Sequence, residues 1–246
     1  MALCKAEAVT LRLTDFSETS QVAVFYTREF GRISALAKGS KRPGNNFEGR
    51  LDLLCHNDIV FARKRSSSLH TLTECKLLDR FMGLRAGAER MYAGLYLAEL
   101  VIAMTQPEES DPRLFALLVT SLRALGKGQE VDLVVLSFEV RLLALCGFAP
   151  SLEACVNCGA TELGRASVRY SPLLGGVLCR KCREADGRSV GVPRGALAAL
   201  ARIADGTVSQ PSRLKLPPSI VAALRKLMKA TVAHQLGREP KLARYV

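Results

Sequence analysis

The first 80 residues consist of short apolar or alternating runs that are separated by clusters of Asp, Ser, Gly, Pro and Asn. Alternation of apolar and polar side chains is typical of a strand that buries one face, and the polar clusters are typical of turns. The runs cover residues 8–13, 21–26, 33–37, 59–62 and 69–77. We therefore predict about five short strands in this part of the chain.

Beyond residue 80 the apolar residues recur at three- and four-residue spacing, which is the period of an α-helix. Helices are predicted over residues 86–104, 112–125, 133–145 and 193–203, and from Pro217 or Pro218 to about residue 236. Asp111 precedes Pro112 at the second of these starts, where Asp can cap a helix and Pro suits its first turn.

These patterns predict an α+β multidomain protein. Residues 1–80 would form a five-stranded β-barrel, either an OB-fold, which commonly handles single-stranded nucleic acid, or an SH3-like barrel. Residues 81–246 would form an α-helical domain, and a cysteine-containing insertion at about residues 151–187 interrupts its helices.

The 246-residue chain has an ordinary globular composition, with 48% hydrophobic and 24% charged residues, so most of it should fold without disulfides. Its net charge of +12 indicates a polyanionic partner, because a summed positive potential attracts phosphate groups. Lys and Arg outnumber Asp and Glu by 13 to 9 in residues 1–80 and by 16 to 4 in residues 165–246. They number 6 against 10 between these segments, so the excess lies at the two ends.

No stretch approaches the roughly 20 apolar residues of a transmembrane helix, and the first residues lack the order of a signal peptide. We expect a cytoplasmic protein with no membrane partner. Eight cysteines in a reducing compartment are not expected to form a disulfide framework, so their spacing must be examined for metal binding or catalysis.

Two Cys-x-x-Cys pairs, Cys155 with Cys158 and Cys179 with Cys182, are separated by 20 residues. This spacing is typical of a zinc site, in which two tight turns present four thiolates to one ion. With four protein ligands a Zn²⁺ ion would have no open position, so its role would be structural. A redox-active pair and unpaired buried thiols are the alternatives, but a redox pair would occur singly.

Arg180 and Lys181 lie inside the second pair, where they could contact DNA phosphates or merely offset the charge of the thiolates. The other four cysteines have apolar neighbours and no ligand spacing, so we interpret them as small buried hydrophobic residues. They are Cys4, Cys55, Cys75 and Cys146.

Basic residues cluster in two stretches of the predicted barrel, on or beside loops that could follow a phosphate backbone. The predicted DNA-binding residues are Arg28, Arg32, Lys38, Lys41 and Arg42 in the first stretch and Arg63, Lys64 and Arg65 in the second. Five aromatic residues could stack on bases, although aromatic residues on alternating strands are more often part of a core. These are Phe25, Tyr26, Phe30, Phe47 and Phe61.

The sequence offers no catalytic motif. It lacks the P-loop pattern and the glycine-rich pattern of a dinucleotide site, and its three histidines have no partners at the spacing of a triad or a metal centre. Asp52 and Asp58 could hold Mg²⁺ as in a nuclease, but no other residue supports that reaction. We therefore predict that the protein is not an enzyme.

Several segments resemble the RecO family of bacterial DNA repair proteins, and they follow one another in the order of that family. They are residues 26–43 (YTREFGRISALAKGSKRP), 69–74 (LHTLTE) and 138–150 (FEVRLLALCGFAP), the cysteine array with Gly175 and Gly176, and residues 234–241 (HQLGREPK).

The resemblance implies an N-terminal OB-fold and a helical domain with an embedded zinc finger. It also implies binding of single- and double-stranded DNA, annealing of complementary strands without ATP, and, with the partner RecR, loading of RecA onto strands coated by single-stranded-DNA-binding protein (SSB). Such a protein would be cytoplasmic and associated with the nucleoid. Some members lack the four cysteines, so zinc would be a structural option.

Two other functions stay open. The protein could be a protein-interaction adaptor with a structural zinc site and only incidental DNA binding, in which case the charges of the barrel would matter little for DNA. It could also be an enzyme, which would need a metal ion or ATP for turnover.

Overall fold

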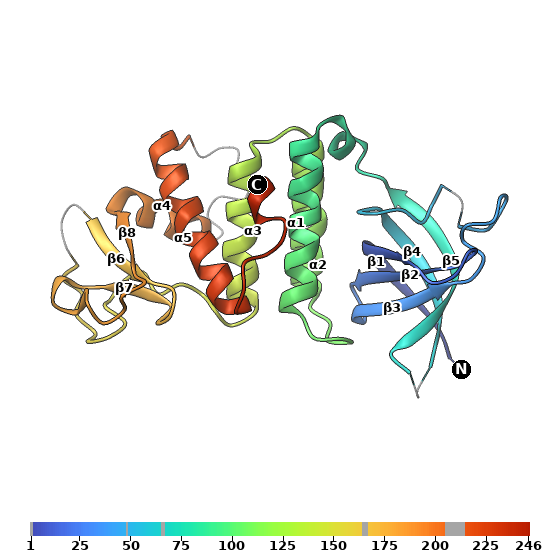
Figure 1. The fold of residues 1–246 in the computed structure, drawn as a ribbon, viewed down its shortest axis with the longest axis horizontal. Coiled ribbons are helices and arrows are strands. Elements are labelled where there is room, and N and C mark those ends of the chain that lie inside the picture. Colours follow the sequence, from blue (N-terminus) through green and yellow to red (C-terminus); the bar gives the residue numbers. More distant parts are fainter. Residues whose placement is uncertain (1, 48, 65–66, 164–166, 205–214) are drawn as a thin grey trace. The chain divides into compact units, whose positions relative to one another are not determined.

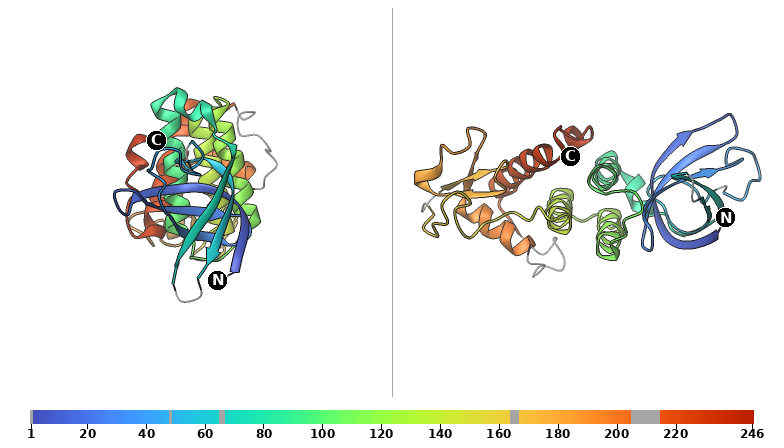
Figure 2. Two further views of the ribbon diagram at one scale, coloured as in Figure 1. Left: turned by 90° about the vertical axis from the view of Figure 1, so that its right-hand side faces the viewer. Right: turned by 90° about the horizontal axis from the view of Figure 1, so that it is seen from below.

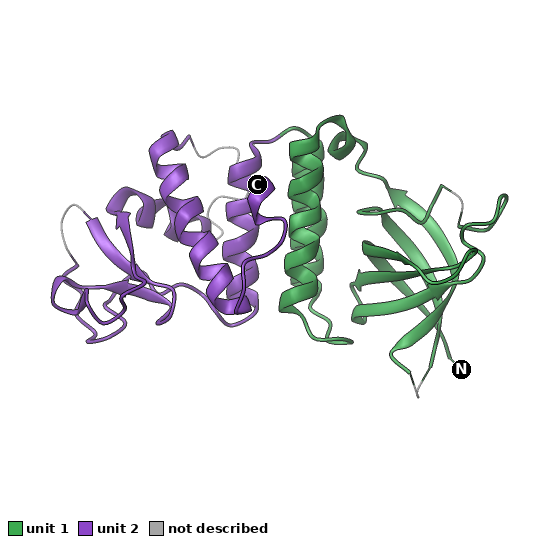
Figure 3. Ribbon diagram, viewed as in Figure 1, with its two compact units in different colours: residues 1–128 green, residues 129–246 purple. Residues whose placement is uncertain are grey.

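The computed structural model describes residues 2–47, 49–64, 67–163, 167–204 and 215–246. Contacts divide the chain into two compact units, residues 1–128 and 129–246 (Figure 3). Each unit combines strands with helices (Figure 1), which confirms the predicted α+β fold class. The domain boundary between residues 80 and 81 stays a prediction.

The strands of the first unit close into a barrel in the order β1-β2-β3-β5-β4 (Figure 2). Neighbouring strands are antiparallel except β3 and β5, which run parallel. The five-stranded barrel is therefore confirmed, and the OB-fold stays our interpretation of it. The strands are β1 Ala2–Asp15, β2 Gln21–Thr27, β3 Gly31–Ala37, β4 His56–Arg63 and β5 Leu69–Asp79.

The barrel is filled by the inward-facing side chains of its strands. On β3, Ile33 and Ala35 are buried, whereas Arg32 and Ser34 beside them are only partly so, which is the two-residue period of a strand with one covered face. Closure of the barrel removes these apolar faces from water, and this burial favours the closed fold. The buried core consists of Ala6, Ala8, Ala23, Phe25, Ile33, Ala35, Ala37, Phe47, Ile59, Phe61, Leu72 and Cys75.

Two helices complete the first unit, α1 Ala88–Met104 and α2 Pro112–Gly126, after a 3₁₀ turn over Met82–Ala86. The predicted cap is confirmed at the start of α2. Asp111 Oδ1 accepts a hydrogen bond of 2.8 Å from the backbone N–H of Arg113. This bond satisfies one of the donors that a helix leaves free at its N-terminus.

The connection between α1 and α2 packs directly on the barrel. The backbone N–H of Glu108 donates to the carbonyl of Arg32 at 3.0 Å. Gly31 begins β3 with a φ of 64°, and a Cβ added there would lie 2.0 Å from the carbonyl oxygen of Glu109. Only glycine combines this left-handed backbone with so close an approach, so Gly31 fixes the helix connection against β3.

Within its described residues, the second unit contains three helices and a three-stranded sheet with the order β7-β6-β8. The helices are α3 Val131–Leu145, α4 Arg194–Ala204 and α5 Pro218–Leu236. Two 3₁₀ turns cover Arg180–Cys182 and Ala243–Tyr245. The strands are β6 Ser167–Ser171, β7 Gly176–Leu178 and β8 Val190–Pro193. Within the described ranges, every helix is too short or too polar to span a bilayer.

Strand β8 differs from the prediction, which began a helix at Pro193. Pro193 instead pairs with Ser167 at the end of β8, and α4 begins one residue later, at Arg194. Because β8 is an edge strand, the missing N–H of Pro193 leaves no neighbouring strand unpaired.

A buried ion pair joins α5 to α3 in the second unit. Arg225 Nη1 lies 3.1 Å from Glu139 Oε2, and Arg225 Nε lies 3.3 Å from Asp132 Oδ1. The side chain of Glu139 is only 1% exposed. A buried, ionised carboxylate is destabilising unless a positive charge lies beside it. Arg225 supplies that charge for Glu139.

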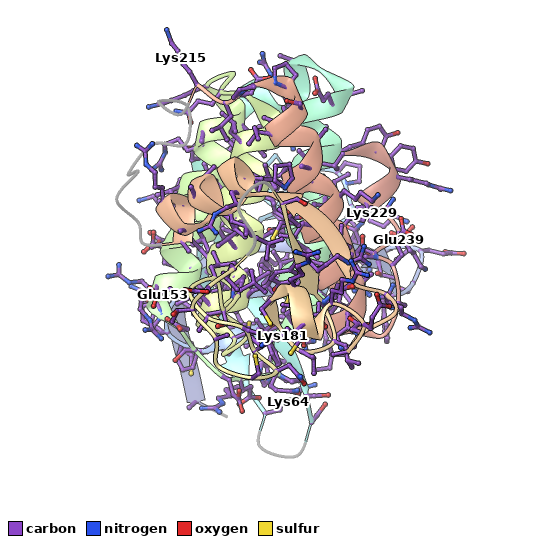
Figure 4. All side chains as sticks on the ribbon, turned by 90° about the vertical axis from the view of Figure 1, so that its left-hand side faces the viewer. Lys64, Glu153, Lys181, Lys215, Lys229 and Glu239 are labelled. Carbon is purple, nitrogen blue, oxygen red and sulfur yellow. The ribbon has the colours of Figure 1, made fainter. Side chains whose placement is uncertain are left out.

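We expect Arg225→Ala to lower the free energy of unfolding of the protein by about 3–5 kcal/mol, because it removes the positive charge that lies next to the buried carboxylate of Glu139. Chemical denaturation followed by circular dichroism measures this change. Lys229→Ala is the matched control on the same helix, since Lys229 pairs with Glu239 at 2.8 Å on the surface (Figure 4). That exposed pair should contribute less than about 1 kcal/mol. Equal effects of the two substitutions would contradict the assignment.

Candidate metal centre and nucleic-acid interface

The four cysteines of the array lie on two tight turns. In the first turn, the backbone N–H of Gly159 donates to the carbonyl of Cys155 at 2.8 Å, and Gly159 has a φ of 74°. In the second, the N–H of Cys182 donates to the carbonyl of Cys179 at 3.1 Å. Each turn brings the two thiols of one pair to the same side of the backbone, as the Cys-x-x-Cys spacing predicts.

Strand β7 brings the two turns together. The N–H of Val156, in the first turn, donates to the carbonyl of Val177 at 2.9 Å, and Val177 lies two residues before Cys179. A Cβ added to Gly176 would lie 2.3 Å from Val156 Cγ1, so the first turn rests on a position where a larger residue would not fit. The hairpin of β6 and β7 thus sets the distance between the cysteine pairs.

The four sulfur atoms have the spacing of a tetrahedral metal site. All four lie within 4.8 Å of one another, and the Sγ atoms of Cys158 and Cys179 are 3.7 Å apart. A tetrahedron with metal–sulfur bonds of about 2.3 Å has edges of about 3.8 Å, so one ion fits between them. Asn157 Nδ2 donates to Cys182 Sγ at 3.3 Å and supports that ligand from outside the cluster.

The thiols of the cluster differ in pKa. Burial raises the pKa of Cys155, but backbone N–H groups that donate to its sulfur have the larger combined effect and lower it to about 6. The N–H of Ala160 lowers the pKa of Cys158, whereas hydrogen bonding with the other three thiols raises it to about 12. A metal ion that binds all four sulfur atoms would have to displace the thiol protons that remain.

The other four cysteines lie outside this cluster, and all eight are free. Cys55 and Cys75 are buried, and Cys4 and Cys146 are partly buried. Burial raises the pKa of Cys75 to about 12. Cys75 lies in the barrel core and Cys4 packs against it, as predicted, whereas Cys55 lies near the charged side chains of Asp52 and Arg85. In the described part of the chain, the four-cysteine cluster is the one group of three or more potential metal ligands.

Two residues of the first basic stretch make contacts within the fold. Arg32 Nη2 donates to the carbonyl of Thr105 at 2.9 Å, and burial together with the neighbouring charge of Arg12 lowers the pKa of Arg32. Arg32 thus connects β3 to the end of α1. Arg28 pairs with Glu7 at 3.3 Å but remains largely exposed.

The other residues of this stretch, Lys38, Lys41 and Arg42, are exposed on the turn that follows β3, which we call the basic turn (residues 38–42). Lys41 Nζ lies 2.8 Å from Asp15 Oδ2, and its hydrogen bond lowers the pKa of Asp15. Because this ion pair is open to solvent, a phosphate group can replace Asp15 as the partner of Lys41 at little cost. The basic turn is therefore available to a polyanion.

The second basic stretch is only partly free. Arg63 pairs with Glu108, and its guanidinium lies 5.8 Å from the centre of the Phe30 ring. Lys64 is half-buried, and Arg65 lies outside the described residues. In the second unit, Arg180 and Lys181 are exposed on the 3₁₀ turn between Cys179 and Cys182, and Lys181 lies beside the sulfur atoms (Figure 4). They have the exposure that a phosphate contact requires.

The five aromatic residues considered for base stacking are buried or partly buried, and all but Tyr26 pack in the core cluster of the barrel. Four of them are buried, and Phe30 is partly buried with its ring edge-on to Phe61 at 5.4 Å. Their interpretation as core residues was correct. Phe16, which no motif or spacing in the sequence singles out, is 60% exposed and is the one exposed aromatic residue among those described in the barrel.

A groove of about 1130 Å³ also lies on the barrel, along β1, β4 and β5. None of the described residues predicted to bind DNA lines it. Its charged lining is balanced, with three basic and three acidic side chains, so it offers no positive surface to a phosphate backbone. These are Lys5, Arg50, Lys76, Glu29, Asp58 and Glu74.

The residues considered for a magnesium site, Asp52 and Asp58, do not form such a site with other acidic or histidine side chains in the described ranges. Asp52 Oδ2 instead accepts a hydrogen bond of 2.7 Å from Arg85 Nη2.

Comparison with known proteins gives a consistent result along the whole chain. Residues 1–81 match the family model "Recombination protein O N terminal", and residues 85–244 match "Recombination protein O C terminal". The DNA repair protein RecO of Symbiobacterium thermophilum is 31% identical over 98% of this chain and 95% of its own. The DNA repair protein RecO of Rhodopirellula baltica is 33% identical over 96% of both chains. That of Rubrobacter xylanophilus is 33% identical over 96% of this chain and 94% of its own.

Proposed function

The chain belongs to the RecO family, whose role is in DNA repair and recombination, and from this premise we propose that it is a non-enzymatic mediator. In this proposal the protein binds single- and double-stranded DNA and anneals complementary strands. With RecR, it helps to load RecA onto single-stranded DNA coated by SSB. It acts in the cytoplasm, at the nucleoid.

The observation that carries the proposal is the basic turn, where Lys38, Lys41 and Arg42 extend into solvent from a closed barrel. Annealing needs no bond-making chemistry. A basic surface that neutralises two phosphate backbones lowers their repulsion and raises their local concentration, and base pairing then selects the partner. Arg28 and Arg63 supply further charge from the barrel. Arg180 and Lys181, and the C-terminal segment with its excess of basic residues, supply the rest from the second unit.

We expect the purified protein to accelerate duplex formation between two complementary oligonucleotides without ATP. The acceleration should decrease as salt is added, because salt reduces the free energy gained by releasing counterions from DNA. Fluorescence energy transfer between labelled strands measures the rate, with and without SSB. No acceleration, together with weak DNA affinity even at low salt, would favour a protein-interaction adaptor instead.

Reversing the charge of the basic turn should weaken DNA binding. We expect the double variant Lys41→Glu, Arg42→Glu to bind single-stranded DNA roughly tenfold more weakly or worse at low salt. The slope of log affinity against log salt should fall by about 1.4, since each lost phosphate contact removes about 0.7 on a single strand. Fluorescence anisotropy across a salt series measures both quantities.

The matched control reverses two exposed basic residues of the α2 region, Arg113→Glu and Lys127→Glu, and so makes the same change in net charge. This control should retain most of the affinity and the slope. Equal losses in the two double variants would mean that net charge matters and that the basic turn has no specific role in binding.

We further propose that one structural Zn²⁺ ion is held by Cys155, Cys158, Cys179 and Cys182. The spacing of the sulfur atoms supports a soft, tetrahedral ion, which thiolates select. When bound, the ion joins the two turns by metal–sulfur bonds and contributes folding free energy to the second unit. It leaves no open position for substrate, so annealing does not pass through it.

We expect one zinc ion per chain, measured by inductively coupled plasma mass spectrometry, and its loss in Cys179→Ser. Binding must displace thiol protons, above all that of Cys158 with its pKa of about 12, so zinc affinity should fall as the pH is lowered below 8. The zinc-free protein should also melt at a lower temperature. Cys146→Ser, which lies outside the cluster, should keep the metal. Equal zinc contents in the two variants would contradict the ligand assignment.

A further inference from the structure

Phe16 is a solvent-exposed apolar side chain on a hydrogen-bonded turn. It follows β1, and its backbone N–H donates to the carbonyl of Ser20 at 2.9 Å, where the N–H of Ser17 also bonds at 3.2 Å. The turn that connects β1 and β2 is thereby fixed, yet the ring stays 60% exposed. Exposed aromatic residues at fixed positions are typical of binding surfaces.

The turn that carries Phe16 is bonded to the basic turn. The backbone N–H of Lys41 donates to the carbonyl of Thr19 at 3.0 Å, and the N–H of Gly39 donates to Ser20 Oγ at 3.1 Å. Lys41 Nζ also reaches Asp15, the residue before Phe16, at 2.8 Å. These bonds, which come from both backbones and side chains, hold an exposed ring and exposed cations on one edge of the barrel.

We infer that Phe16 is a base-stacking residue that binds an unpaired base of single-stranded DNA while the basic turn contacts the adjacent phosphates. The inference rests on the proposed DNA-binding function and assigns one residue within it. An aromatic face accepts any base, because every base has a π-face, so this contact favours single strands without favouring a sequence. A duplex keeps its bases stacked on one another and offers no such face to Phe16.

The chemistry of the edge favours nucleic acid over an apolar partner. Phe16 follows Asp15 in the chain, and Asp15 pairs with Lys41, so charged groups lie on the same turns as the ring. A phosphate that pairs with Lys41 would place the neighbouring base beside the turn that carries Phe16. The other aromatic side chains described in the barrel are buried or partly buried, so none of them presents an open face to a base as Phe16 does.

The chain contains no tryptophan, so Phe16→Trp creates a single fluorescent reporter at the inferred contact. We expect oligodeoxythymidine to quench this fluorescence until the protein is saturated, because stacking on a base quenches indole. A duplex of equal length should quench it far less. Phe148→Trp is the matched control, since Phe148 is 48% exposed in the second unit. Equal quenching at the two positions, or none at Phe16→Trp, would overturn the inference.

Affinity measurements separate the ring from the charges. Phe16→Ala should weaken binding of oligodeoxythymidine roughly 5- to 150-fold, the range for loss of one stacked base. Its salt slope and its affinity for duplex DNA should stay at the wild-type values, because no phosphate contact is lost. Phe16→Tyr, which keeps the ring, should bind as the wild type does.

Two negative results have different meanings. If Phe16→Ala binds single strands as tightly as the wild type does, Phe16 is not a stacking residue, but the proposed function stands. If the wild-type protein binds neither oligodeoxythymidine nor duplex DNA at low salt, the proposed function fails and the inference fails with it.

Discussion

Parallel pairing of β3 with β5 is the constraint on which the first unit depends. The register joins Ser34 to Leu69, Ala35 to His70 and Leu36 to Thr71, and this ladder closes the barrel. A parallel pair cannot be joined by a tight hairpin. The chain that follows β3 therefore leaves the sheet, re-enters it as β4 and only then forms β5. The basic turn is the first part of that excursion. Closure therefore buries the apolar faces and also leaves Lys38, Lys41 and Arg42 outside.

The helix connection at residues 105–111 decides which basic residues remain free. It accepts a hydrogen bond from Arg32 at the carbonyl of Thr105, and Glu108 pairs with Arg63. Glu108 also lies 3.3 Å from the buried ring of His70, whose pKa is lowered by burial. Positive charge counted along the sequence thus divides into a structural part, which attaches α1 and α2 to the barrel, and a part that faces solvent. Arg32 belongs to the first part, whereas Arg63 pairs with Glu108 while 45% of its side chain stays exposed.

The second unit relies on crosslinks between short elements. Strand β7 holds the two cysteine turns at the separation that one metal ion needs, and Arg225 ties α5 to α3 through Glu139 and Asp132. A three-stranded sheet with a strand as short as Gly176–Leu178 has little apolar area of its own. A metal ion held by the four cysteines, as proposed, would therefore stabilise the edge from which Arg180 and Lys181 extend.

The sequence by itself determined the barrel strands, the long helices, the cap at Asp111 and the pairing of four cysteines in one array, because each follows from local periodicity or spacing. It could not decide which face of a strand is covered. Alternation separates Phe25 from Val24, but only closure of the barrel buries Phe25 and leaves Phe16 in water on its turn. Likewise, Arg32 and Lys41 are equivalent in a charge count. Tertiary packing alone gave Arg32 a backbone carbonyl as partner and left Lys41 on the surface, since burial is a property of neighbours that are distant in sequence.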